Sequence, residues 1–139
     1  MAERPDLDYA IPRLRAALCG RLIEQVTVLD PVVLRLMEHG TLEGLVEGLT
    51  IEAVDRRAQF AHVTLSGGRS VLVAPMLAGR FALGAKGKRR RKDVVVALAL
   101  DDGVELLYRD DVRMGKVYVC QTEAWTTIPG LQQIGLDAL

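Results

Sequence analysis

The largest concentration of charge in the sequence is a short basic run. It places six cations within seven residues, namely Lys86, Lys88, Arg89, Arg90, Arg91 and Lys92. The whole chain has 18 basic and 18 acidic residues, so 12 basic residues face 18 acidic ones outside the run. Like charges this close repel one another, and a phosphate-rich partner relieves that repulsion. The run therefore predicts a contact with DNA or another nucleic acid, whereas a solvated loop is the alternative interpretation.

Residue types that serve in catalysis or metal binding also occur, but their spacing suits neither. His39 and His62 are isolated from cysteines and carboxylates at metal-ligand spacing. Ser66 and Ser70 flank a turn, and no histidine accompanies them in a pattern typical of a catalytic triad. We therefore expect no metal site and no cofactor.

The cysteines and the paired aspartates favour structural roles. Cys19 and Cys120 lie far apart in the sequence and have no further cysteines to pair with, so they predict neither a zinc site nor a disulfide framework. We expect two buried thiols in a cytoplasmic protein. The segment Asp101-Asp102-Gly103 is typical of a hairpin turn.

The elements that must position these residues begin with a helix. Apolar residues recur at helical spacing through residues 7–18, and Gly20 follows as a stop signal. Because Pro12 lies inside this pattern, we expect the regular helix to begin near Pro12 or to kink there. Residues 22–29 then predict a strand, and a short helix is expected around residues 42–46.

From residue 50 onward the hydrophobic period changes from helical to two, which is typical of strands. The expected strands form two hairpins and a further strand, over residues 51–65 and 70–73, 94–100 and 104–108, and 116–121. At least six short strands behind one leading helix predict a mostly β domain with flanking helices. We expect a two-sheet β-sandwich or a flattened barrel.

The length and the apolar runs bound the class of protein. The chain has 139 residues, half of them hydrophobic, which suits one compact domain. Its longest apolar run, Val94 to Leu100, is far shorter than the ~20 residues that span a bilayer. No basic-then-apolar leader opens the sequence. We expect a cytoplasmic protein without membrane contact.

Several short stretches occur in the order in which a known family has them. They are M-A-E-R-P-D-L-D at residues 1–8, Leu14, Leu18 and Gly20 in the first helix, I-E-A-V-D-R-R-A-Q-F at 51–60, Y-R-D-D-V-R-M-G at 108–115 and I-G-L-D-A-L at 134–139. Over nearly the whole chain they resemble the N-terminal domain of the Fpg/Nei DNA glycosylases, the formamidopyrimidine-DNA glycosylase and endonuclease VIII group. The resemblance implies a two-sheet β-sandwich with helices at its ends.

The resemblance also implies a chemistry on damaged bases in DNA. In that family an N-terminal proline, freed of the initiator Met, attacks the sugar through its amine and forms a Schiff base, and the next glutamate acts as an acid. Ala2 occupies the nucleophile position here, and Glu3 is kept. These two residues are the candidate catalytic pair, and only if Met1 is removed, because Ala2 otherwise has no free amine.

The positions that contact DNA in the family are partly rebuilt. Gln59 stands in place of a lysine that contacts phosphates, and Leu77 in place of a methionine wedge that fills the hole left by a flipped base. Val112 and Met114 replace an arginine and an intercalating phenylalanine, whereas Arg113 is kept. The resemblance therefore adds Gln59, Leu77 and Arg113 to the basic run as candidate nucleic-acid-binding residues.

Three hypotheses about function follow. We expect a single domain over residues 1–139, without the helix–two-turn–helix and zinc-finger domain of full family members. The favoured hypothesis is a non-catalytic nucleic-acid-binding or interaction module related to DNA base-excision repair. The second is a weak DNA glycosylase and AP lyase that uses the Ala2 amine with Glu3. The third is a protein-only adaptor or dimerisation module, in which a protein partner replaces nucleic acid.

Overall fold

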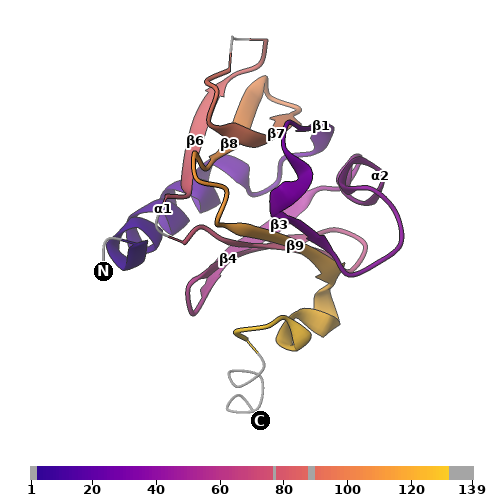
Figure 1. Cartoon of the computed structure of the whole chain (residues 1–139). Helices are drawn as coiled ribbons and strands as arrows, with labels where there is room; N and C mark the ends of the chain where they lie inside the picture. Colours follow the sequence, from indigo (N-terminus) through magenta and orange to yellow (C-terminus); the bar gives the residue numbers. More distant parts are fainter. Residues whose placement is uncertain (1–2, 77, 88–89, 132–139) are drawn as a thin grey trace.

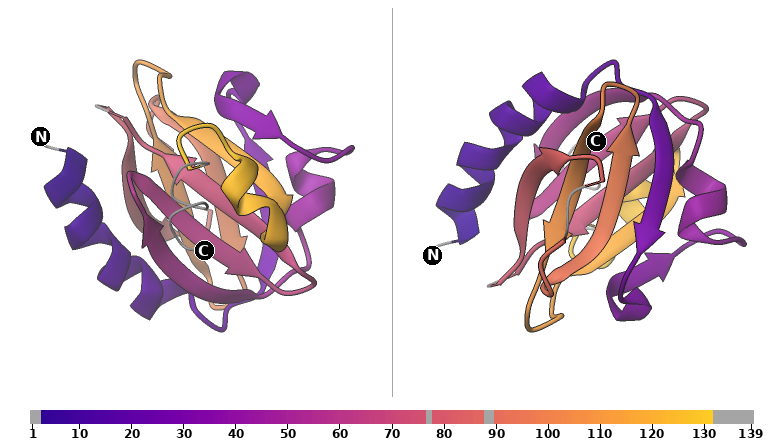
Figure 2. Two further views of the ribbon diagram at one scale, coloured as in Figure 1. Left: turned by 90° about the horizontal axis from the view of Figure 1, so that it is seen from below. Right: turned by 90° about the horizontal axis from the view of Figure 1, so that it is seen from above.

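Two facing β-sheets form the body of the molecule, and a long helix lies along one open side (Figures 1 and 2). This computed structural model describes residues 3–76, 78–87 and 90–131. The four-stranded sheet has the order β1 (Ile23–Val28), β7 (Val94–Leu100), β8 (Val104–Arg109), β6 (Arg80–Ala85). The five-stranded sheet has the order β2 (Leu34–Leu36), β9 (Lys116–Gln121), β5 (Arg69–Ala74), β4 (Phe60–Leu65), β3 (Ile51–Arg57).

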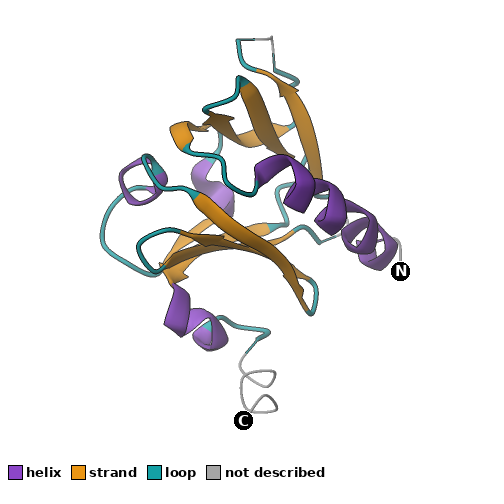
Figure 3. Cartoon of the chain, turned by 180° about the vertical axis from the view of Figure 1, so that it is seen from behind, coloured by secondary structure: helices purple, strands orange, loops and turns teal. Residues whose placement is uncertain are grey.

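In the described part of the chain, four helical segments flank the sheets. Figure 3 shows helices around the strands. The four segments are the α-helices α1 (Glu3–Leu18) and α2 (Leu42–Val46) and the 3₁₀ segments η1 (Pro31–Val33) and η2 (Thr122–Thr127). The two-sheet β-sandwich with flanking helices that the sequence predicts is therefore confirmed.

The core lies between the inner faces of the sheets and under α1. Leu7, Ile11, Leu14 and Leu18 of α1 are buried, because their spacing of three to four residues places them on one face of the helix. They pack with buried valines, leucines and isoleucines from both sheets. The helix begins at Glu3, well before Pro12, so the expectation that it begins near Pro12 is wrong. Pro12 is exposed, and burial of the apolar face on both sides of it offsets the lost hydrogen bond.

Most of the predicted strands are confirmed, and four features differ from the sequence prediction. Residues 51–65 form a hairpin of their own, β3–β4, because Ala58 adopts a left-handed conformation (φ 53°) and turns the chain. Strand β6 follows the β4–β5 hairpin and was not predicted, nor was β2, which pairs in parallel with β9. Both thiols are free, but Cys120 is buried whereas Cys19 is only half-buried.

A second apolar cluster on the five-stranded sheet lies beside a buried histidine, and Trp125 packs against both. The buried members of this cluster are Phe60, Leu72, Ala74, Cys120, Ile128 and Leu131. His62 of β4 is 2% exposed. Its Nδ1 accepts a hydrogen bond from Arg57 Nε (3.3 Å), so its Nε2 carries the hydrogen that faces Ser70 Oγ at 2.9 Å. Ser70 Oγ in turn lies 2.9 Å from Thr122 Oγ1. This polar contact and the buried Ile128 hold η2 against β4 and β5.

The helices of the described residues include none that is both long and apolar enough to cross a membrane.

Candidate nucleic-acid interface

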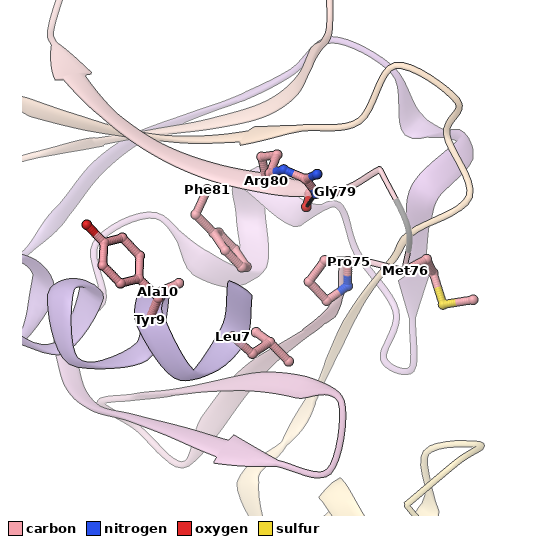
Figure 4. Close-up of a pocket in the computed structure, with 8 residues that line it drawn as sticks. All are labelled: Leu7, Tyr9, Ala10, Pro75, Met76, Gly79, Arg80 and Phe81. Atoms are coloured by element: carbon pink, nitrogen blue, oxygen red, sulfur yellow. Dashed lines mark hydrogen bonds between the residues drawn. The ribbon is translucent and has the colours of Figure 1, made fainter. Parts of the chain in front are cut away.

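A pocket opens beside the first turns of α1, between this helix and the segment that joins β5 to β6 (Figure 4). Its lining residues are Leu7, Tyr9 and Ala10 from α1, Pro75, Met76 and Gly79 from the joining segment, and Arg80 and Phe81 from the start of β6. Glu3, one residue of the predicted catalytic pair, is the first residue of α1. Ala2 lies outside the described residues, and the side chain of Glu3 is not among those described.

The wall of the pocket is closed by a very tight contact around the hydroxyl of Tyr108. A Cβ atom on Gly79 would lie 2.4 Å from the carbonyl oxygen of Pro75 and 2.5 Å from Tyr108 Oη. A Cβ atom on Gly115 would lie 1.9 Å from the same hydroxyl. Only glycine fits at both positions, because any side chain would push Tyr108 out of place. This contact joins the pocket to the loop of residues 110–115.

The loop of residues 110–115 is built on a buried carboxylate. Asp110 is 0% exposed. Its Oδ2 accepts hydrogen bonds from Gly115 N at 2.7 Å and from Tyr108 Oη at 3.2 Å, and its Oδ1 accepts one from Arg113 N at 2.9 Å. Burial, reinforced by the neighbouring Asp110 carboxylate, raises the pKa of Tyr108, so its hydroxyl keeps the proton that it donates. The loop is therefore fixed from within.

Arg113 anchors the loop of residues 110–115 to its surroundings. It has a left-handed backbone (φ 57°), and its Nε donates to Asp30 Oδ2 at 3.0 Å. Its other nitrogens reach the carbonyl oxygens of Asp110 at 2.8 Å and Lys92 at 3.5 Å. The Asp30 carboxylate also accepts from the backbone of Val32, and these hydrogen bonds hold its pKa below the usual range. Arg113 thus links the loop to the end of the basic run.

The outer surface of this loop is apolar. Val112 is 54% exposed and Met114 is 51% exposed, whereas Asp110 of the same loop is fully buried. Met76, also exposed, lines the adjacent pocket and has a left-handed backbone (φ 59°). Leu77, the predicted wedge, lies outside the described residues.

The cations of the basic run are not equivalent. Arg90 forms an ion pair with the buried Glu105, with 2.6 Å between its Nη2 and Glu105 Oε2. Lys86 is paired at 3.4 Å with Glu24, and both side chains are exposed. The Arg91 side chain is 72% exposed, although its Nε lies 3.6 Å from Asp93. Lys92 is exposed too, and Lys88 and Arg89 lie outside the described residues.

The structure brings together some of the predicted residues but not all. Arg113 joins the loop of residues 110–115 to Lys92, and Tyr108 joins the same loop to the pocket at the start of α1. Gln59 lies exposed in the turn between β3 and β4, and it is not among the hydrogen-bond partners of Arg113 in the described part of the chain.

Sequence reasoning missed the residues that hold this site in shape. Asp110 and Gly115 belong to the family-like stretch at residues 108–115, and this resemblance was the only sequence signal that could have indicated their role. Glu105 and Asp30 carry no such signal, because their partners are distant in the sequence. The described part of the chain contains no group of three His, Cys, Asp or Glu side chains that could hold a metal ion.

Comparison with known proteins establishes the class of domain that this fold and site define. The chain belongs to the family described as the formamidopyrimidine-DNA glycosylase N-terminal domain, whose model matches residues 1–117. This result confirms the resemblance seen in the sequence. Formamidopyrimidine-DNA glycosylases of Brevibacillus brevis and Moorella thermoacetica are each 30% identical to it along its whole length. The chain spans about half of these relatives, 50% and 51% of their lengths.

Solved structures with the same fold include glycosylases bound to DNA. The complex of Lactococcus lactis Fpg with DNA containing an abasic site matches with a TM-score of 0.82 at 16% identity, over 96% of this chain and 47% of that one. MutM in complex with DNA containing carbocyclic 8-oxo-G matches with a TM-score of 0.82 at 15% identity, over 88% of this chain and 45% of that one. At these identities the likeness concerns the fold.

Proposed function

We propose that this domain is a nucleic-acid-binding module related to DNA base-excision repair, and that it lacks the proline-based catalysis of its family. The observation that carries the proposal is the Asp110 network. It fixes an exposed apolar loop between a pocket and the end of a cationic run. The replacement of the nucleophilic proline by Ala2 supports the loss of catalysis.

The site has the two kinds of group that a bent or gapped nucleic acid requires. Exposed cations such as Arg91 and Lys92 neutralise phosphates and release counterions, which makes binding sensitive to salt. Exposed apolar side chains such as Val112 and Met114 can enter a base step that is already unstacked. Because Arg113 is held by Asp30, its role in this proposal is to position the loop between these two groups.

A second candidate function is a weak AP lyase. The Ala2-Glu3 sequence at the positions of the family's catalytic pair favours it, and a pocket lies beside the first turns of α1. After removal of Met1, the Ala2 amine would attack the open-chain C1′ aldehyde of an abasic site. The resulting C=N bond forms with loss of water, and Glu3 would supply the proton to the departing oxygen. With Met1 in place, the nitrogen of Ala2 is an amide and cannot attack.

Borohydride trapping on a duplex with one abasic site, at low and at physiological salt, separates the two functions. The protein and Glu3→Gln are compared, and mass spectrometry reports whether Met1 is present. We expect a salt-dependent mobility shift of the duplex without a trapped complex. A trapped complex that requires loss of Met1 would establish the lyase instead. Absence of both signals at low salt would overturn the nucleic-acid-binding proposal.

A charge-reversal pair locates the binding surface. Arg91→Glu together with Lys92→Glu is expected to weaken binding of the duplex about tenfold or more at low salt, and to lower the slope of log affinity against log salt by about two. Arg35→Glu, at an exposed arginine on β2 of the other sheet, is the control and reverses one charge instead of two. An equal effect per reversed charge would indicate a general charge effect and not a site.

A further inference from the structure

A groove runs along α1 on the side of strand β6. Three adjoining hollows form it, and neighbouring hollows share residues such as Phe81 and Leu83. The first is the pocket of Figure 4, and the others continue along the helix past Arg13 and Ala17. The last and widest, of about 600 Å³, reaches Ala85 at the end of the strand. The groove therefore follows β6 over its full length.

The groove exists because α1 is held to the opposite sheet. Arg15 Nε donates to the carbonyl oxygen of Val54 at 2.9 Å, and its Nη2 lies 3.4 Å from Asp55. A second ion pair joins Asp8 of the helix to Arg56. All three partners belong to β3, the outermost strand of the five-stranded sheet. The helix is thus attached to β3 of one sheet. Figure 2 shows it beside β6 of the other sheet.

Strand β6 is the outermost strand of its sheet, and its hydrogen-bonding pattern can be derived. The Lys86 N–H donates to Gly103 O at 2.9 Å, which extends the antiparallel register between β6 and β8. Hydrogen-bonded pairs alternate along such a ladder, so every second residue faces β8. The backbone N–H and C=O groups of Phe81, Leu83 and Ala85 therefore point away from β8 and into the groove.

The side chains that line the groove are apolar and basic. Leu83 is 46% exposed and Tyr9 is 64% exposed. The Arg13 guanidinium lies 4.2 Å from the centre of the Tyr9 ring, which orients it along the wall. Among the described residues that line the three hollows, Asp102 is the one acidic residue. It forms an ion pair with Arg21 at 3.4 Å. The groove thus has a positive wall and an apolar floor.

We propose that the groove binds an extended acidic segment of a partner protein, which adds to the four-stranded sheet as a further strand beside β6. The free N–H and C=O groups of Phe81, Leu83 and Ala85 complement the backbone of another strand. A carboxylate of the segment pairs with Arg13, and an apolar side chain covers Leu83. We expect nucleic acid to bind this groove more weakly, because it has no row of peptide N–H and C=O groups to pair with β6. The groove shares the pocket of Figure 4 with the candidate nucleic-acid interface, but the β6 backbone, Arg13 and Leu83 belong to the groove alone, so this proposal does not depend on the nucleic-acid function.

The probe is an acetylated peptide amide with alternating valine and glutamate, compared with a valine–lysine peptide of equal length. Both are titrated into ¹⁵N-labelled protein. We expect the acidic peptide to shift the amide signals of Phe81, Leu83 and Ala85 and to slow their hydrogen exchange at least tenfold. Leu83→Gln removes the apolar contact without adding charge and should weaken binding at least tenfold, while Leu29→Gln, at an exposed leucine of similar accessibility, should not. Arg13→Glu should reverse the preference toward the lysine peptide.

The remaining outcomes contradict the proposal. A thymidine oligonucleotide that protects the same three amides, without an effect of either peptide, would make the groove a nucleic-acid site. Self-association of the protein that Leu83→Gln abolishes would make a second copy of the chain the occupant. Binding of both peptides with no change in the exchange of the Leu83 amide would place them elsewhere on the surface.

Discussion

At the scale of single residues, one carboxylate determines the shape of the candidate interface. Asp110 accepts three hydrogen bonds in a fully buried position, and two glycines pack around the Tyr108 hydroxyl that it holds. Asp110 and Gly115 match the family pattern, whereas the exposed Val112 and Met114 depart from it. The residues that build the loop are thus kept, and those that would touch a partner have changed.

Replacement of Asp110 by asparagine tests this interpretation. The amide has one acceptor oxygen for three donors and carries no charge, so we expect a loss of about 3 kcal/mol in the free energy of unfolding. Urea denaturation measures it. Asp111→Asn, at the exposed neighbour, should stay within about 0.5 kcal/mol of the parent protein. Equal losses for the two changes would contradict the structural role of Asp110.

Two adjacent arginines of the basic run are expected to differ in role. Arg90→Ala leaves the buried Glu105 without its cation and should cost about 3 kcal/mol of stability, measured by urea denaturation. Arg91→Ala should cost less than about 0.5 kcal/mol because its side chain is largely exposed. In a duplex-binding assay the order should be reversed, with Arg91→Ala causing the loss of affinity. An unchanged affinity for Arg91→Ala would remove this residue from the interface.

At the scale of elements, His62 connects β4 and β5 to the terminal η2. Burial, together with the charge of Arg57, lowers the pKa of His62 to about 4, while the nearby Asp55 acts in the opposite direction. The unfolded chain therefore binds a proton at higher pH than the folded chain, and stability falls as the pH falls from about 6.5 toward 4. The contact of η2 with the sheet thus depends on a neutral histidine.

Acidification gives a measurable test of that dependence. From pH 7.5 to pH 5, titration of His62 should remove about 2 kcal/mol from the free energy of unfolding. His62→Gln, which keeps a donor and an acceptor but does not titrate, should lack this part of the pH dependence. His39→Gln, at the exposed histidine, should retain it. If His62→Gln has the same pH profile as the parent protein, the buried histidine is not the titrating group.

The sequence could predict elements whose signal is local. The hairpin β7–β8 has a regular period of two and an Asp-Asp-Gly turn, and its strands were predicted almost to the residue. Strand β2 has three residues and depends on its parallel pairing with β9, which no local pattern encodes. The turn between β3 and β4 relies on Ala58 in a left-handed conformation, where glycine would be the usual signal.

The candidate site likewise combines local features with contacts between residues far apart in the sequence. The basic run was visible because charge is a property of composition. The ion pair of Arg90 with Glu105 and that of Arg113 with Asp30 were not, since residues 15 and 83 positions apart meet only in the fold.

At the scale of the whole molecule, zero net charge conceals an uneven distribution. The cations of the basic run lie between β6 and β7, while acidic residues are in excess elsewhere in the chain. A polyanion is attracted to the first region and repelled by the remainder, which favours one orientation of approach. The uneven charge distribution therefore orients the domain relative to a polyanion, even though its net charge is zero.

The strand order has a consequence for a chain that is cut. Strands β1 and β6 precede the basic run, yet they pair with β7 and β8, which follow it; in the other sheet, β9 lies between β2 and β5. Trypsin should cleave first at the exposed Arg91. The two fragments should nevertheless co-elute in gel filtration and separate only in denaturant, because neither can complete a sheet without the other. The halves of this molecule are interlocked, so the peptide bond at the basic run is not what keeps them together.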